Sequence, residues 1–311
     1  MRTVTAALMG ACLLTGEAAA DGYDTVRDAL QSGDQETAYT ALAEMGDAGD
    51  TLAMIMLSYL QLSEVSGPQG LGLSIVWLEQ AAAEGNIHAM LRLGAMYQRT
   101  GPALFPDRSN MAMAAGWPEA IRWYGVAEEA GSPVALTRLG VLHRLGLSAV
   151  MGETMTPEEE RALSIQYLEQ AVAAEQVEAM AHMAITLRTD DPARASEFAL
   201  RAAAAGHPAA LGLLAGRPQD FGVTDPVEAL AWKMAAKIAW ALAPDPRSQM
   251  FILPGAQTGA EFNAMMDEAI AAASPADRAA AEARAAEISA GWTSLLPGHS
   301  GDGGGGLFGR D

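Results

Sequence analysis

Cysteine is almost absent from this sequence, since Cys12 is the only one in 311 residues. A single cysteine forms no intramolecular disulfide, so the fold has to rest on packing and hydrogen bonds. Positive charge is also scarce, with 19 Lys and Arg against 38 Asp and Glu and a net charge of −19. Such a chain repels phosphate backbones, so nucleic acid is not the expected ligand.

Aromatic residues make up only 6% of the chain, whereas 50% of its residues are hydrophobic. Alanine, leucine, methionine and glycine dominate the composition. This mixture suits helices that pack through small residues better than a sheet, which favours β-branched and aromatic residues. We therefore expect an all-α protein.

The first 20 residues have the layout of a secretory signal peptide. Arg2 supplies an early positive charge, an apolar run extends from Val4 to Leu14, and small residues lead up to Ala20. The run is too short to span a bilayer. We expect cleavage after Ala20 and a periplasmic or secreted protein that does not insert into the membrane. The alternatives are a buried amino-terminal helix and lipidation at Cys12, whose preceding residues match a lipoprotein signal poorly.

A pattern of small and large apolar residues recurs along the chain. Counted from Trp77, it has Ala at four residues, Gly at eight, Ala at twelve and Leu-Gly at sixteen and seventeen, and Trp123 starts a second copy with the same residues. Weaker copies start at Ala41, Tyr167, Phe198 and Trp232. The spacings of 31 to 46 residues are typical of helix-pair repeats.

Each copy is interpreted as two helices. The aromatic residue and the Ala four positions later share one helix face, and the Gly ends that helix because it tolerates a left-handed conformation. A second helix follows, seen complete at Ala89, Leu93, Gly94 and Tyr97. Its small residues let neighbouring backbones approach closely, and the tryptophans fill the core. A pair of this kind buries its apolar face only by stacking, so the sequence predicts an α-solenoid.

The pattern resembles the Sel1-like repeat, a relative of the tetratricopeptide repeat, over about residues 34 to 240. The resemblance is carried by Trp77, Gly85, Ala89, Leu93, Gly94 and Tyr97, and by Ala120, Trp123, Tyr124, Ala127, Gly131, Ala135, Leu139 and Gly140. Glu175 departs from the pattern, because it occupies the position of the helix-ending Gly. The resemblance implies a scaffold that binds protein or peptide partners.

The sequence predicts five segments: a signal peptide at 1–20, a repeat array at 21–243, a linker at 244–259, capping helices at 260–292 and a disordered glycine-rich tail at 293–311. The capping helices are expected at about 260–272 and 275–290, where Ser274 precedes Pro275 as a good helix cap. Two insertions, at 100–118 and 146–157, break the period. Each is either part of a binding face or a spacer.

No motif of a known catalytic site or phosphate-binding loop occurs in the chain, so we expect no catalytic, metal or cofactor site. The five histidines are not spaced as metal ligands on one helix. His143 replaces a core aromatic residue, and a packing or buried hydrogen-bonding role is expected for it. The other histidines are interpreted as surface or turn residues.

One set of residues is a candidate binding site. Arg92, Arg138 and His182 each stand fifteen residues after a repeat start, so stacking would align them on consecutive second helices, partly exposed. They would then face a groove that accepts a carboxylate-bearing partner, or would pair internally with Glu residues of neighbouring units. Trp117 lies outside the repeat register before a helix expected near Glu119, where it either anchors a partner or forms a hydrophobic staple.

These observations favour a periplasmic adaptor that holds a protein or peptide, with a role in envelope regulation or assembly. Secreted relatives rich in cysteine imply an alternative, the binding or hydrolysis of β-lactams or cell-wall fragments. Their repeats are held by disulfides, whereas this chain has no cysteine after Cys12. A purely structural role in the envelope is a third possibility.

Overall fold

The structure is a computed structural model that describes residues 20–64, 68–104, 116–146, 148, 155–242 and 259–292. Nearly all of the predicted signal peptide and linker, the tail and much of both insertions lie outside these residues.

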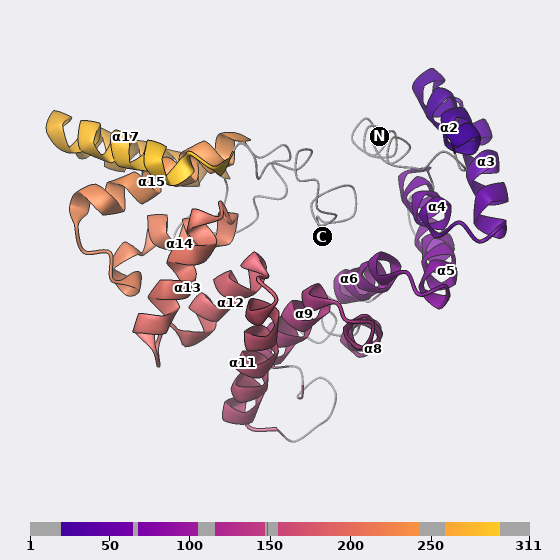
Figure 1. Ribbon diagram of the computed structural model, residues 1–311, viewed down its shortest axis with the longest axis horizontal. Coiled ribbons are helices and arrows are strands. Elements are labelled where there is room, and N and C mark those ends of the chain that lie inside the picture. Colours follow the sequence, from indigo (N-terminus) through magenta and orange to yellow (C-terminus); the bar gives the residue numbers. More distant parts are fainter. Residues whose placement is uncertain are drawn as a thin grey trace. The chain divides into compact units, whose positions relative to one another are not determined.

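The described residues form fourteen α-helices, one short 3-10 helix and no strand. The α-helices are α2 (Ala20–Ser32), α3 (Gln35–Asp47), α4 (Thr51–Glu64), α5 (Pro68–Ala83), α6 (Ile87–Leu104), α8 (Trp117–Glu129), α9 (Pro133–Arg144), α11 (Pro157–Ala173), α12 (Val177–Leu187), α13 (Pro192–Ala204), α14 (Pro208–Gly216), α15 (Pro226–Leu242), α16 (Gly259–Ala272) and α17 (Pro275–Ser289). The predicted all-α class is confirmed (Figure 1).

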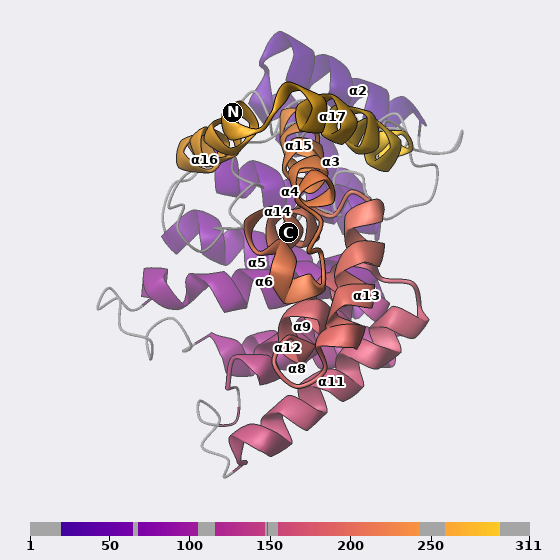
Figure 2. The ribbon, with the colours of Figure 1, turned by 90° about the vertical axis from the view of Figure 1, so that its left-hand side faces the viewer.

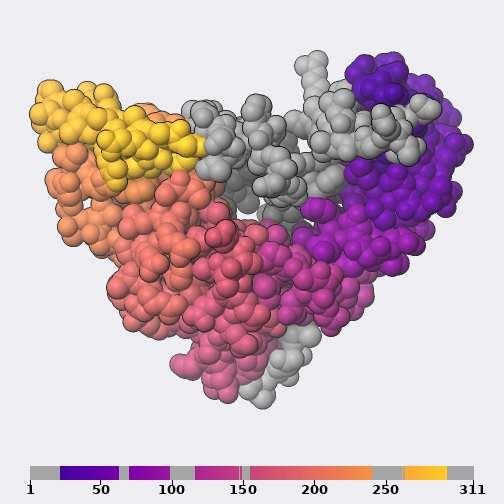
Figure 3. Space-filling model, in the orientation of Figure 1, coloured from indigo at the N-terminus to yellow at the C-terminus, as the bar shows by residue number. Residues whose placement is uncertain are grey.

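The described chain divides within α9 into two compact units, an N-terminal one up to Ala135 and a C-terminal one from Leu136. In the N-terminal unit each helix from α2 to α6 packs against the next, and α8 packs against α6. In the C-terminal unit the same succession runs from α11 to α15, which can be followed in the side view of Figure 2. In the space-filling view of Figure 3, α13 to α15 of this unit form a continuous packed surface.

The predicted repeats correspond to helix pairs. The starts at Ala41, Trp77, Trp123, Tyr167 and Phe198 lie on α3, α5, α8, α11 and α13, and each of these helices is followed by a second one. The last start, Trp232, lies on α15. Consecutive pairs stack through their apolar faces, so the predicted α-solenoid is confirmed.

The turn between the two helices of a pair repeats in detail. At the end of α5, Gly85 has a φ of +84°, and the amides of Gly85 and Asn86 donate to the carbonyls of Ala82 and Ala81 at 2.9 and 3.1 Å. Glu175 closes α11 with the equivalent pair of bonds and a φ of +59°, and it is the one non-glycine residue of the described part with a positive φ. That conformation costs a non-glycine residue about 1–2 kcal/mol.

Glycines also set the distance between neighbouring pairs. A β-carbon on Gly94 of α6 would overlap the ring of Tyr124 on α8, and one on Gly140 of α9 would lie 2.8 Å from Cγ of Leu168 on α11. The predicted close approach of backbones at this repeat position is therefore confirmed at both sites.

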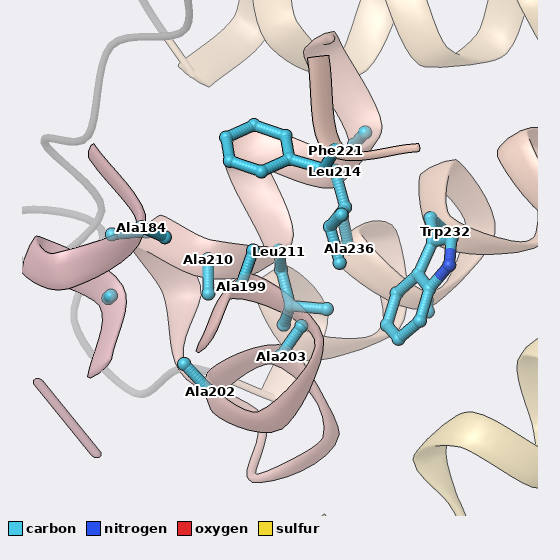
Figure 4. Packing of buried hydrophobic residues seen from close by; sticks show 14 of the residues in the cluster. Ala184, Ala199, Ala202, Ala203, Ala210, Leu211, Leu214, Phe221, Trp232 and Ala236 are labelled. Atoms are coloured by element: carbon cyan, nitrogen blue, oxygen red, sulfur yellow. The ribbon is translucent and has the colours of Figure 1, made fainter. Parts of the chain in front are cut away.

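The core of the C-terminal unit is built largely from alanine and leucine. Figure 4 shows Ala199 and Ala203 of α13 around Leu211 of α14, with Trp232 of α15 nearby. Trp123 and Trp232 are both buried, as expected for residues that fill the core. The small side chains allow the helices to pack closely, and the large ones fill the remaining space.

Both ends of the described chain have a covering helix. The helix α2, which the repeat pattern did not identify, buries Tyr23 and Val26, and the Tyr23 hydroxyl donates to Asp50 Oδ1 at 2.9 Å. At the other end α16 and α17 pack against α15 (Figures 1 and 2). Beyond α17 the buried Trp292 donates its indole N–H to the Ala204 carbonyl at 2.9 Å. The predicted capping helices are thereby confirmed.

We predict that Gly94→Ala lowers the free energy of unfolding of the N-terminal unit by about 1–3 kcal/mol, because the added methyl group forces the Tyr124 ring to move. Gly125→Ala on α8 is the matched control, since a β-carbon there meets nothing within 4 Å. It should leave stability unchanged or raise it by about 0.5–1 kcal/mol. Urea unfolding followed by tryptophan fluorescence measures both effects. Equal midpoints for the two variants would contradict the prediction.

Candidate functional site

Two of the three residues predicted to align on the second helices, Arg138 and His182, lie near the same carboxylate, that of Glu178 in the C-terminal unit. Arg138 of α9 donates through Nη1 to Oε1 of Glu178, in the first turn of α12, at 3.0 Å. Nε2 of His182, one turn further along α12, lies 3.8 Å from the same oxygen. Helices α9 and α12 are the second helices of consecutive repeats, so their equal positions come together as the stacking argument requires.

The side-chain exposures of these residues differ from the expectation in one case. Arg138 is 22% exposed and Glu178 29%, so partial exposure holds there, but His182 is only 9% exposed. The expectation that His182 is a surface or partly exposed residue is wrong. The reason is that α12 is enclosed on most sides, with eight of its eleven residues buried. Of the two alternatives for these residues, a partner groove and internal pairing with Glu, the internal ion pair is present at Arg138. Partner binding by these residues stays a prediction.

Charges around Glu178 shift the protonation of two groups. Burial acts to raise the pKa of Glu178, but His182 and the positive charge of Arg138 outweigh it and lower that pKa to about 2. His207, at the start of α14, belongs to the same cluster. Burial lowers its pKa to about 4, although the charge of Glu178 acts in the opposite direction. The cluster is therefore an ionised carboxylate near an arginine and two histidines, and His207 is neutral at pH 7.

The third residue of the predicted set lies in the N-terminal unit. The guanidinium carbon of Arg92, on α6, lies 4.5 Å from the centre of the Tyr59 ring on α4. This is the geometry of a cation–π contact.

A second polar cluster joins α9 to α11. His143 Nδ1 lies 2.8 Å from Oε2 of Glu160, and its ring stacks on Tyr167 with centroids 5.6 Å apart. The other oxygen of Glu160 accepts the amide of Ser148. Burial acts to raise the pKa of Glu160, and the hydrogen bonds from Ser148 and His143 outweigh it, so this pKa is lowered. The packing and hydrogen-bonding role expected for His143 is confirmed, and the cluster is a structural link.

Trp117 is the first residue of α8, which begins two residues before the predicted Glu119. Its side chain is partly buried. The preceding Gly116 provides no side-chain cap, and Pro118 occupies the first turn. Partner binding by Trp117 stays a prediction.

The described residues contain no group of three or more His, Cys, Asp and Glu side chains placed to hold a metal ion. In the same part of the chain, no helix combines the length and the hydropathy that crossing a membrane requires.

Comparisons with known proteins identify the fold. No protein family and no curated protein matches the sequence. A protective antigen present in uropathogenic Escherichia coli strains, which displays an SLR fold, is similar in structure with a TM-score of 0.58 and 17% identity, over 84% of this chain and 50% of that one. The match thus spans half the length of that antigen. A Sel1 repeat protein from Oxalobacter formigenes has a TM-score of 0.48 and 21% identity, over 65% of this chain and 78% of that one. The first similarity shows that the chain has the Sel1-like repeat (SLR) fold.

We predict that acid destabilises the C-terminal unit through His207. Its folded pKa of about 4 lies below its ordinary 6.5, so the unfolded chain binds the proton more tightly. The stabilisation is complete above pH 6.5, falls as the pH drops through 6.5 to about 4, and amounts to at most about 3 kcal/mol. The Glu178 contribution is present above its ordinary 4.5 and is lost as the pH falls from 4.5 towards 2.

Urea unfolding of the wild type and of His207→Gln between pH 7 and pH 4 tests this. The wild type should lose stability across the range, and the variant should lose less. An NMR titration gives the pKa of His207 directly. A value near the ordinary 6.5 would contradict the prediction.

Proposed function

We propose that this chain is a periplasmic or secreted scaffold that binds a protein or peptide partner. The observation that supports it best is the succession of stacked helix pairs with an SLR fold. In such an array neighbouring units bury one another's apolar faces, and the remaining faces form a surface that extends along the stack.

The geometry of the second helices supports this function physically. Arg138 and His182 stand at the same position of consecutive repeats, and both reach Glu178. Side chains at equal positions therefore lie next to one another along the array. An extended segment of a partner that runs across the units would meet a regular series of such side chains. Recognition of a partner then needs no single deep pocket.

The first helices contribute a polar outer surface. On α11 the residues Glu158, Gln166 and Glu169 are exposed, and on α13 Arg194 and Arg201 are exposed. Exposed polar residues on the outer faces keep a repeat array soluble while its apolar faces stack.

Export from the cytoplasm is part of the proposal. The early positive charge at Arg2, the apolar run from Val4 to Leu14 and the small residues that lead up to Ala20 support it. Among the described side chains of α2 the first buried one is Tyr23, so cleavage after Ala20 would keep every described core residue.

We predict that the mature protein begins at Asp21 and is released with the periplasmic or secreted fraction. Edman sequencing or intact-mass measurement of the protein from that fraction checks the cleavage site. Ala18→Arg with Ala20→Arg should leave the precursor uncleaved, because signal peptidase requires small residues there. Cys12→Ser is the control and should be processed normally. Loss of processing in Cys12→Ser would instead indicate lipidation.

We predict that the protein, tagged at its C-terminus and crosslinked in its native envelope, co-purifies with a specific protein partner. The sequence-predicted residues are tested by Arg92→Ala with Arg138→Ala, which should reduce capture of that partner about tenfold or more. Arg194→Ala with Arg201→Ala is the matched control, because it removes the same charge from an exposed face of α13. Quantitative mass spectrometry measures the enrichment.

The possible outcomes test the scaffold proposal and the predicted binding residues separately. If no protein is enriched over a mock purification, the scaffold proposal fails. If capture is unchanged in the Arg92, Arg138 variant, the prediction for those residues is wrong, while the scaffold proposal stands.

A further inference from the structure

Arginines of this acidic chain are almost all engaged by a neighbouring group. Carboxylates, carbonyl oxygens or aromatic rings contact Arg27, Arg92, Arg122, Arg138, Arg161, Arg194, Arg201, Arg217, Arg278 and Arg284. Among the arginines whose side chains the structure describes, Arg144 and Arg188 are the exceptions. Neither has an ion pair, a hydrogen bond or a ring contact with the described residues, although the chain contains 38 Asp and Glu.

These two arginines occupy the same place in consecutive repeats. Arg144 is the last residue of α9 and Arg188 is the C-cap of α12, each twenty-one residues after its repeat start. The Arg138–Glu178 ion pair holds α9 and α12 side by side in the C-terminal unit. The two arginines therefore stand at equivalent helix ends of two repeats that this ion pair joins.

A position at a helix C-terminus explains part of this pattern, because a cation there complements the helix dipole. It does not explain the burial of Arg144. Its Nε is buried without a hydrogen-bond partner, and burial lowers the pKa of its guanidinium. The next second helix, α14, has Arg217 as its C-cap, and there Asp220 supplies a carboxylate at 3.8 Å. An internal partner is thus provided in one unit and missing in the two before it.

An exposed leucine adjoins one of these helix ends. Leu145 directly follows Arg144 and is 51% exposed, which makes it one of four large hydrophobic residues exposed in the described part. An exposed apolar side chain next to Arg144 offers an apolar contact beside a cation, and arginine is enriched at protein interfaces. We call Arg144, Leu145 and Arg188 the helix-end patch.

We propose that the helix-end patch is a docking surface for an acidic and apolar segment of a partner protein. Carboxylates of that segment pair with Arg144 and Arg188, and an adjacent apolar side chain packs on Leu145. Charge complementarity selects this occupant, because the patch offers cations without internal partners on a chain of net charge −19. The inference rests on the proposed scaffold function and assigns it a place and a partner chemistry.

The test measures fluorescence anisotropy of the mature chain, residues 21–311, with a fluorescein-labelled peptide of repeated Gly-Glu-Leu triplets at low ionic strength. Two further peptides replace Glu by Gln or Leu by Ala. The Glu-Leu peptide should bind, and both replacements should weaken binding about tenfold or more, since one removes the charge pairing and the other the apolar contact. Raising the salt concentration should also weaken binding.

Variants connect the binding to the patch. Arg144→Gln with Arg188→Gln should weaken binding of the Glu-Leu peptide about tenfold or more, and Leu145→Ala should weaken it several-fold. The control is Arg194→Gln with Arg201→Gln, which changes the net charge equally on α13 and should leave affinity within about twofold. Circular dichroism shows whether each variant is folded.

Several results would overturn the proposal: no binding of the Glu-Leu peptide, equal binding of the Gln peptide, or equal affinity in the patch and control variants. Competition by millimolar inorganic phosphate as effective as unlabelled peptide would assign the patch to small anions instead. Failure here leaves the scaffold function standing if crosslinking in the envelope still captures a partner. If crosslinking captures no partner but the Glu-Leu peptide still binds, the scaffold function is contradicted and the assignment of the helix-end patch stands.

Discussion

The close approach of helices at Gly94 and Gly140 is the constraint on which the arrangement of the repeats depends. Without a side chain at these positions, the second helix of one pair lies directly against Tyr124 or Leu168 on the first helix of the next. That distance decides whether equal positions of neighbouring units can interact. The pairing of Arg138 with Glu178 on neighbouring repeats depends on it.

Polar clusters add specific links to this packing. Glu178 holds α9 to α12 through Arg138, and Glu160 ties α9 to α11 through His143. Both carboxylates are partly or fully buried, and each has a cation, an imidazole or an amide beside it. Removing one partner from such a pair leaves an uncompensated charge, so these links make the stacking geometry specific as well as stable.

Much of the fold could be predicted from the sequence, because the helix-pair repeat depends on local patterns. The aromatic residue, the small residues and the turn glycine recur at fixed offsets, and Glu175 shows that the turn geometry persists where the glycine does not. The helix α2 was not identified, because it lies before the first recognisable copy. The candidate site was predicted less well. Neither the enclosure of His182 nor the pairing of Glu178 with Arg138 follows from spacing, since both depend on which helices lie against α12.

The indole of Trp292 restricts where this array of helix pairs can be lengthened. By donating to the carbonyl of Ala204 at the end of α13, it attaches the last described residue of the chain to a unit 88 residues earlier. The same ring packs against Gly206, where a β-carbon would lie 3.3 Å from it. A unit added after α15 would displace this ring and expose the surface it covers. The hydrogen bond between Trp292 and Ala204 therefore restricts where the array can be lengthened, because an insertion after α15 would have to break it.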